Sequence, residues 1–137
     1  MDARFRAVVN LDGLTEGQPI YVEANGRPLL QPFMYLGKPL PNGLSAERRT
    51  KQDEILRSVG GGSFRVLIAG ATHASFSDEP FWAPGRGAAP TRMLAVVRAY
   101  LVEFFGRQLL NTRTKLLDGP SADYPEASVE SFSSTPR

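Results

Sequence analysis

Residues 65–78 read RVLIAGATHASFSD, and they predict a buried strand that leads into a turn carrying a histidine. His73 is the only histidine of the chain. An unperturbed imidazole changes its protonation near neutral pH, so histidine suits proton transfer. Open α/β sheets place their sites beyond the carboxyl ends of their strands. We therefore interpret His73 as a candidate general base; the alternative is a loop histidine that hydrogen-bonds a neighbouring backbone group.

The composition is that of a single ordinary globular domain. The chain has 137 residues, of which 42% are hydrophobic and 22% are charged. A formal net charge of +2 is too small to indicate nucleic acid or an anionic membrane as a partner. No apolar run approaches the ~20 residues that span a bilayer. Cysteine is absent, which excludes disulfides and thiolate metal sites, and a single histidine argues against a histidine-based metal cluster. We also expect no cofactor. We recognise no signal peptide and leave the compartment open.

Strand and helix signals alternate along the chain. Three short apolar runs predict core strands, at residues 5–11, 31–37 and 64–71. A polar helix is expected over 46–59 with Ser45 as its N-cap, and an amphipathic helix over 92–110 with Thr91 as its N-cap. Asn25-Gly26 predicts a small hairpin between two apolar pieces. This alternation predicts an α/β fold of parallel β-α-β units with about three core strands.

A carboxylate accompanies the histidine. Asp12 follows the first predicted strand and His73 follows the third, 73 − 12 = 61 residues later. If these strands are parallel, both side chains emerge at the same edge of the sheet, where an aspartate can hold an imidazole in the tautomer that catalysis needs. The alternative for Asp12 is an ordinary Asp-Gly turn residue.

Three aromatic residues follow the histidine, namely Phe76, Phe81 and Trp82. They are candidates for lining an apolar pocket for the acyl or leaving group. The alternative is that they only pack their proline-rich loop onto the core.

Three segments together resemble the carboxyl-terminal half of α/β-hydrolases, and most closely the esterases that are similar to platelet-activating-factor acetylhydrolase and dienelactone hydrolase. The segments are RFRAVVNLDG at 4–13, QPFMY at 31–35 and GATHASFSD at 70–78. The resemblance covers residues 4–110 and implies that Asp12 is the triad acid and His73 the triad base. It also implies a partial hydrolase domain over residues 1–111. Residues 112–137 are then an extension whose last ten or so residues we expect to be disordered.

The nucleophile departs from the family pattern. In α/β-hydrolases a serine in a Gly-x-Ser-x-Gly turn precedes the acid in the chain. Ser45 and Ser63 each follow a glycine by two positions but lack the second glycine, and few residues precede the acid strand. We therefore expect this chain to be the C-terminal fragment of a serine carboxylic-ester hydrolase, and to be inactive alone. The intact enzyme would act on a small ester or a lipid ester, which implies a role in lipid degradation.

Two other functions stay open. The chain is alternatively a non-catalytic α/β interaction module that binds a partner, or another copy, through the edge strand at residues 5–11. It is also alternatively one half of a split hydrolase whose serine lies on another polypeptide. A Gly-x-Ser-x-Gly segment encoded upstream or in a neighbouring frame would distinguish these possibilities.

Overall fold

The computed structural model describes residues 4–13, 23–24, 27–40, 43, 45–78, 89–112 and 115–133. A four-stranded sheet with the spatial order β1-β4-β5-β6 forms its centre. The strands are β1 (Val8–Leu11), β4 (Phe33–Gly37), β5 (Ser63–Ile68) and β6 (Ala127–Phe132). The first three are parallel, as expected, and β6 runs antiparallel to β5. The fold is therefore mixed α/β with an open sheet.

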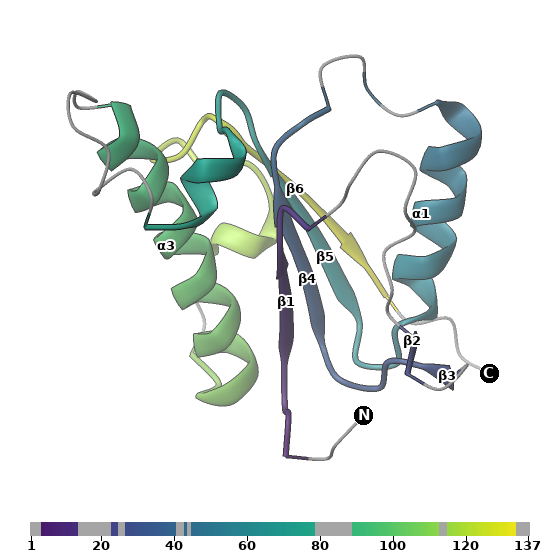
Figure 1. Cartoon of the computed structure of the whole chain (residues 1–137). Helices are drawn as coiled ribbons and strands as arrows, with labels where there is room; N and C mark the ends of the chain where they lie inside the picture. The colour runs from purple at the N-terminus through teal and green to yellow at the C-terminus, as the bar shows by residue number, and fades with distance from the viewer. Residues whose placement is uncertain are drawn as a thin grey trace.

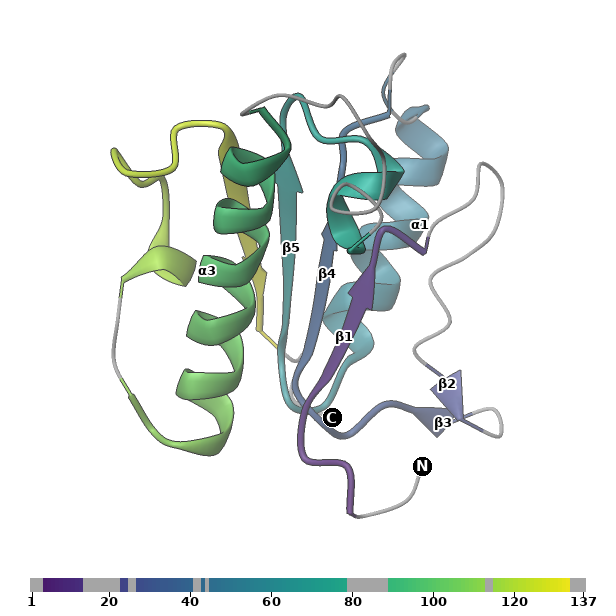
Figure 2. The same ribbon diagram turned by 60° about the vertical axis from the view of Figure 1, so that its left-hand side comes forward.

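Helices cover both faces of this sheet (Figure 1). Helix α1 (Ala46–Ser58) lies on one face, and helix α3 (Ala89–Leu109) lies on the other together with the 3₁₀ helix η1 (His73–Phe76). Figure 2 shows β1 at the edge of the sheet, where the described residues give it one neighbour, β4. Because β1, β4 and β5 are parallel, their carboxyl ends lie together at one end of the strands.

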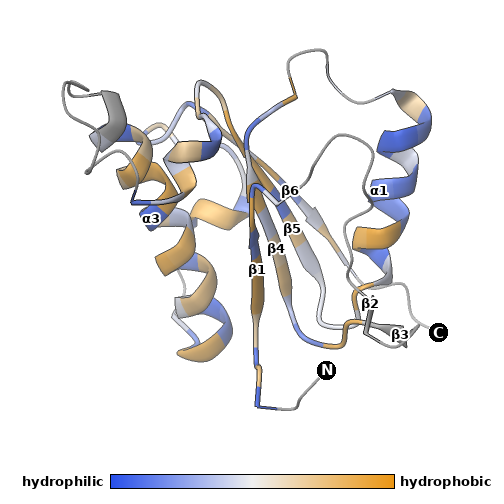
Figure 3. Ribbon diagram, in the orientation of Figure 1, coloured by the Kyte–Doolittle hydropathy of each residue, from blue (hydrophilic) through white to orange (hydrophobic). Residues whose placement is uncertain are grey.

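Period-two alternation in β4 divides the core into two clusters. Met34 and Leu36 pack in the cluster with α3, whereas Phe33 and Tyr35 pack in the cluster with α1. Four buried residues of α3 belong to the larger cluster: Val96, Val97, Tyr100 and Phe104. Helix α1 is mostly hydrophilic and contributes a hydrophobic patch in its last turns (Figure 3), with Leu56 fully buried. Burial of these faces stabilises the layered arrangement.

The C-terminal segment differs from the prediction. We expected about three core strands and a disordered end of the chain over the last ten or so residues. Both expectations are wrong for β6, because this fourth strand is ordered and pairs with the whole of β5. The sequence carries no clear strand signal here. Only Ala127 and Phe132, at the two ends of this six-residue strand, are buried, and the residues between them include two serines. Residues 134–137 lie outside the described part of the chain, and a boundary near residue 111 stays a prediction.

Smaller differences concern the ends of elements. Ser45 caps α1 as predicted, with its Oγ accepting from Arg48 N at 3.3 Å. Helix α3 begins at Ala89, so Thr91 lies inside it and is not its cap. Strands β2 (Glu23–Ala24) and β3 (Arg27–Pro28) pair antiparallel as the expected hairpin, whose tip lies outside the described residues. Strand β1 is shorter than predicted and only partly buried, because it lies at the sheet edge.

The helices of the described segments include none with the length and apolar character needed to cross a bilayer.

Candidate active site

The turn after β5 presents His73. Gly70 adopts φ +78°, a left-handed conformation that glycine takes without strain. The following turn is closed by Ser75, whose Oγ accepts from Thr72 N at 3.0 Å and whose own N–H donates to Thr72 O at 2.9 Å. His73 is the first residue of η1, and 77% of its side chain is exposed. The local sequence thus holds the backbone of the histidine while leaving its ring accessible.

The turn after β1 presents Asp12. Its backbone has φ +47°, which aspartate tolerates better than most residues, and its N–H donates to Leu36 O at 2.8 Å. The amide oxygen of Asn10 accepts from Gly13 N at 2.7 Å and closes the turn. The Asp12 side chain is only 4% exposed, so this carboxylate is buried at the end of the edge strand.

These two side chains meet, as the sequence predicts. His73 Nδ1 lies 2.9 Å from Asp12 Oδ2, a hydrogen-bond distance. Their strands are not neighbours, because β4 lies between β1 and β5, so the pair reaches across the carboxyl end of β4. With Nδ1 engaged by the carboxylate, Nε2 is the ring nitrogen left to exchange a proton with another group. A contact of this kind would allow the aspartate to orient the imidazole.

The other carboxylate oxygen is held by β4 and the residue just after it. Asp12 Oδ1 accepts from Lys38 N at 3.1 Å and lies 3.5 Å from the Tyr35 hydroxyl. Burial, with a smaller contribution from the nearby Asp12 charge, raises the pKa of Tyr35 far above its ordinary value. Tyr35 therefore stays protonated and donates. Sequence reasoning missed both donors: Tyr35 resembles a core residue of an apolar strand, and a backbone N–H leaves no signal in sequence.

The predicted substrate-binding aromatics are only partly located. Phe76 is partly buried and packs against the α3-side core, which agrees with its packing alternative; contact with a substrate stays a prediction. Phe81 and Trp82 lie outside the described residues. The structure thus brings Asp12 and His73 together, and contact of the three aromatics with a substrate stays a prediction.

Ser45, Ser63 and Ser75 can each be considered as a nucleophile within this chain, and each hydroxyl has a structural partner. Ser45 caps α1, and Ser75 closes the turn before η1. Ser63 is 1% exposed and donates to Leu56 O at 2.8 Å. These hydroxyls stabilise helix ends and turns, which disfavours each of them as the nucleophile.

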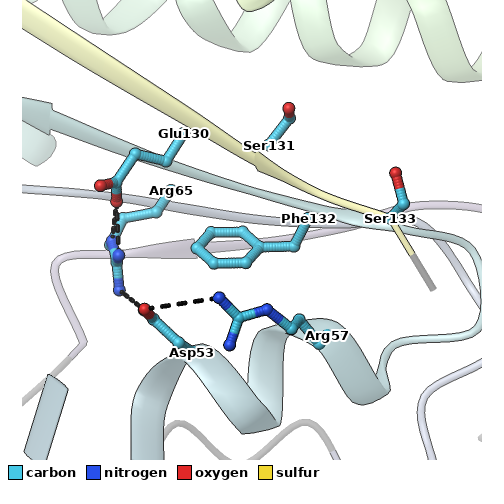
Figure 4. Close-up of a pocket in the computed structure, with 7 residues that line it drawn as sticks. All are labelled: Asp53, Arg57, Arg65, Glu130, Ser131, Phe132 and Ser133. Carbon is cyan, nitrogen blue, oxygen red and sulfur yellow. Dashed lines mark hydrogen bonds and ion pairs between the residues drawn. The ribbon is translucent and has the colours of Figure 1, made fainter. Parts of the chain in front are cut away.

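A second polar cluster lies between α1 and the sheet, around a pocket of about 460 Å³ (Figure 4). Arg65 is 2% exposed and forms ion pairs with Asp53, at 2.8 Å, and with Glu130. Glu130 also pairs with Arg49. The Phe132 ring lies 5.1 Å from the Arg65 guanidinium carbon. Because these charges are mutually paired, we interpret the cluster as a structural link between α1 and the sheet. The pocket is lined by Asp53, Arg57, Arg65, Glu130, Ser131, Phe132 and Ser133.

Within the residues that the structure describes, no group of three or more histidine or acidic side chains is arranged to hold a metal ion. The chemistry that Asp12 and His73 offer is proton transfer.

Comparison with known proteins shows a structural likeness to an esterase. No family model matches the chain, and no curated protein matches it. A ferulic acid esterase from Streptomyces cinnamoneus is similar in structure, with a TM-score of 0.72 and 26% sequence identity. The match covers 93% of this chain and 40% of the esterase chain. This likeness supports an esterase-type, α/β-hydrolase-like fold, while nothing in it indicates platelet-activating-factor acetylhydrolase specificity.

Proposed function

We propose that this chain supplies the acid and the base of a serine carboxylic-ester hydrolase, corresponding to the C-terminal part of such an enzyme. The observation that carries the proposal is the 2.9 Å contact between Asp12 Oδ2 and His73 Nδ1 at the carboxyl ends of the parallel strands β1, β4 and β5. The esterase likeness over 93% of the chain supports it independently. The nucleophilic serine then comes from a Gly-x-Ser-x-Gly segment elsewhere, since this sequence contains no such pattern.

In the proposed reaction, His73 Nε2 takes the proton of the serine hydroxyl as the serine oxygen bonds to the ester carbonyl carbon. The same nitrogen returns the proton to the leaving alkoxide, which departs as the alcohol. In the second half-reaction, His73 Nε2 takes a proton from water as the water oxygen bonds to the acyl carbon, and returns it to the serine oxygen as the carboxylic acid leaves. Asp12 fixes the Nδ1–H tautomer and stabilises the imidazolium that forms between the two proton transfers. Its burial keeps this charge close to the ring and away from bulk water.

The substrate class divides into two candidates. The structural relative is a ferulic acid esterase, which favours an aryl-substituted acyl ester. The sequence resemblance to platelet-activating-factor acetylhydrolase-like enzymes favours a short-acyl lipid ester and a role in lipid degradation. Methyl ferulate and a 2-acetyl phospholipid distinguish them, with p-nitrophenyl acetate as a substrate that either enzyme would accept.

The first experiment measures p-nitrophenyl acetate hydrolysis by the purified chain beside its His73→Ala and Asp12→Ala variants. We expect no turnover above the variants for the chain alone. Adding a polypeptide that carries a Gly-x-Ser-x-Gly turn, taken from the upstream or neighbouring reading frame where one encodes it, should produce turnover that depends on both residues and that a serine-directed organophosphate abolishes. Restored turnover that survives His73→Ala contradicts the proposal. His73-dependent turnover by the isolated chain would instead place the nucleophile within these 137 residues.

An interaction module is the second candidate, favoured by the exposed edge strand β1. Phe5 is 58% exposed and Leu11 is 38% exposed at the two ends of this edge. Such an edge can pair with a strand of another segment or of a second copy. Its signature is a stable complex that forms without any esterase activity, and that persists when His73 is replaced.

A further inference from the structure

Asp12 must present one particular oxygen to His73. A carboxylate has two equivalent oxygens and turns about its side-chain bonds unless something holds it. In this chain the two oxygens have separate partners. Oδ2 faces His73 at 2.9 Å, while Oδ1 faces the Lys38 N–H at 3.1 Å and the Tyr35 hydroxyl at 3.5 Å. The two contacts to Oδ1 therefore determine the direction in which Oδ2 points.

Tyr35 is well placed to serve this purpose. It is 3% exposed, and its ring packs in the α1-side cluster with Leu56 and Val59. That packing leaves the ring little freedom, so the hydroxyl is delivered to Asp12 from a rigid position. The pKa of Tyr35 is raised mainly by burial, which keeps the hydroxyl a donor at working pH.

Gly37 makes room for this hydroxyl. It lies two residues after Tyr35 on the same face of β4, because side chains alternate along a strand. A Cβ built at Gly37 would lie 2.5 Å from Tyr35 Cζ and nearer still to its hydroxyl. Any other residue at this position must therefore displace the tyrosine from Asp12.

We propose that Tyr35 is a positioning residue that fixes the Asp12 carboxylate toward His73, and that Gly37 is required because it admits the Tyr35 hydroxyl. The proposal deepens the proposed function and rests on it for its catalytic meaning. It predicts that the tautomer of His73 depends on two residues that do not contact the imidazole.

The test reads that tautomer directly, without any hydrolysis assay. His73 is the only histidine, so the nitrogen chemical shifts of the isotope-labelled full chain report one ring. Measured in alkaline buffer, the Asp12→Ala variant gives the tautomer ratio of a ring without its partner. We expect the native chain to show an excess of the Nδ1–H form over that reference. Tyr35→Phe should lose at least half of the excess.

Gly37→Ala should produce a similar loss although Tyr35 is still present. Combining Gly37→Ala with Tyr35→Phe should cause no loss beyond that of the larger single effect, because both changes remove the same contact. Tyr100→Phe is the matched control: this buried tyrosine lies in the α3-side cluster, and its hydroxyl has no hydrogen-bond partner among the residues that the structure describes. It should leave the tautomer ratio unchanged.

The failures of the two proposals are distinguishable. A native tautomer ratio in Tyr35→Phe, with a changed ratio in Asp12→Ala, overturns the role of Tyr35 and leaves the triad proposal intact. An unchanged ratio in Asp12→Ala overturns the pairing on which both proposals stand. If Gly37→Ala does not fold, Tyr35→Phe beside Tyr100→Phe decides the question alone, since both substitutions keep the buried ring.

Discussion

Glu103 on α3 offers a direct test of the energetics of this core. This residue is 4% exposed, and within the described part of the chain its Oε1 has no hydrogen-bond partner. Burial raises the pKa of Glu103, the Arg107 charge opposes this, and the Asp118 charge reinforces it. Arg107 donates to Asp118 at 2.7 Å, so its charge is shared with another carboxylate. The ionised form of Glu103 is therefore poorly compensated.

The sign of the pH dependence follows from this shift. The folded chain keeps the Glu103 proton to higher pH than the unfolded chain does. Stability therefore falls as the pH rises from the ordinary glutamate range through the raised folded value, and the penalty is complete above it. Replacing Glu103 by glutamine removes the charge and keeps the shape. An unsatisfied buried polar atom costs about 1–3 kcal/mol, and the amide retains part of that cost, so we expect a gain of about 1 kcal/mol at about pH 8.

Thermal unfolding measures this gain. For a chain of 137 residues, about 1 kcal/mol corresponds to a rise in Tm of roughly 3–4 °C. The gain should shrink toward zero at about pH 4, where the native glutamate is itself protonated. Glu54→Gln, at an exposed position of α1, is the control and should change stability by less than ~0.5 kcal/mol at either pH. A lower Tm for Glu103→Gln at about pH 8, or an equal gain at both pH values, would refute the reasoning.

Three further substitutions test the fold by chemical denaturation. Phe104→Ala removes a fully buried ring from the α3-side cluster and should cost about 3–5 kcal/mol; a loss under ~1 kcal/mol would mean that the ring is not in the core. Ser45→Ala removes the N-cap of α1 and should cost about 1 kcal/mol, with Ser45→Asp restoring most of it. Arg65→Met leaves two facing carboxylates without their shared cation and should cost about 2–3 kcal/mol, whereas unchanged stability would show that the ion pairs are energetically neutral.

The convergence of Asp12 and His73 could be predicted because it depends on one property of parallel strands. Their carboxyl ends share an edge of the sheet, so residues just after two such strands come near each other even when they are distant in sequence. The prediction did not require knowing that β4 separates β1 from β5. The first strand begins later than predicted, at Val8, but it ends at Leu11 as predicted, so Asp12 still directly follows it.

The surroundings of the pair could not be predicted, because they depend on which strand lies between. Only the strand order places the carboxyl end of β4 beneath the carboxylate of Asp12 and supplies Tyr35 and the Lys38 N–H as donors. Strand β6 was missed for a different reason. Its pairing with β5 is antiparallel and non-local, and the six residues of β6 carry too weak an alternation to outweigh a serine-rich composition.

If Asp12 and His73 act as proposed, their different exposures indicate from which side a nucleophile would approach them. Asp12 is 4% exposed and His73 is 77% exposed, so the acid is completed by this chain while the outer face of the base is open. Asp12 directly follows Leu11, and β1 is the edge strand of the described sheet. A strand added along β1 would therefore end within a few residues of the Asp12–His73 pair. In the proposed hydrolase, a serine turn following such a strand would lie near this pair, whose histidine side chain is exposed. The proposed hydrolase therefore predicts that changes on β1 that block strand addition prevent the reconstitution of activity. The same changes should leave the tautomer of His73 unchanged.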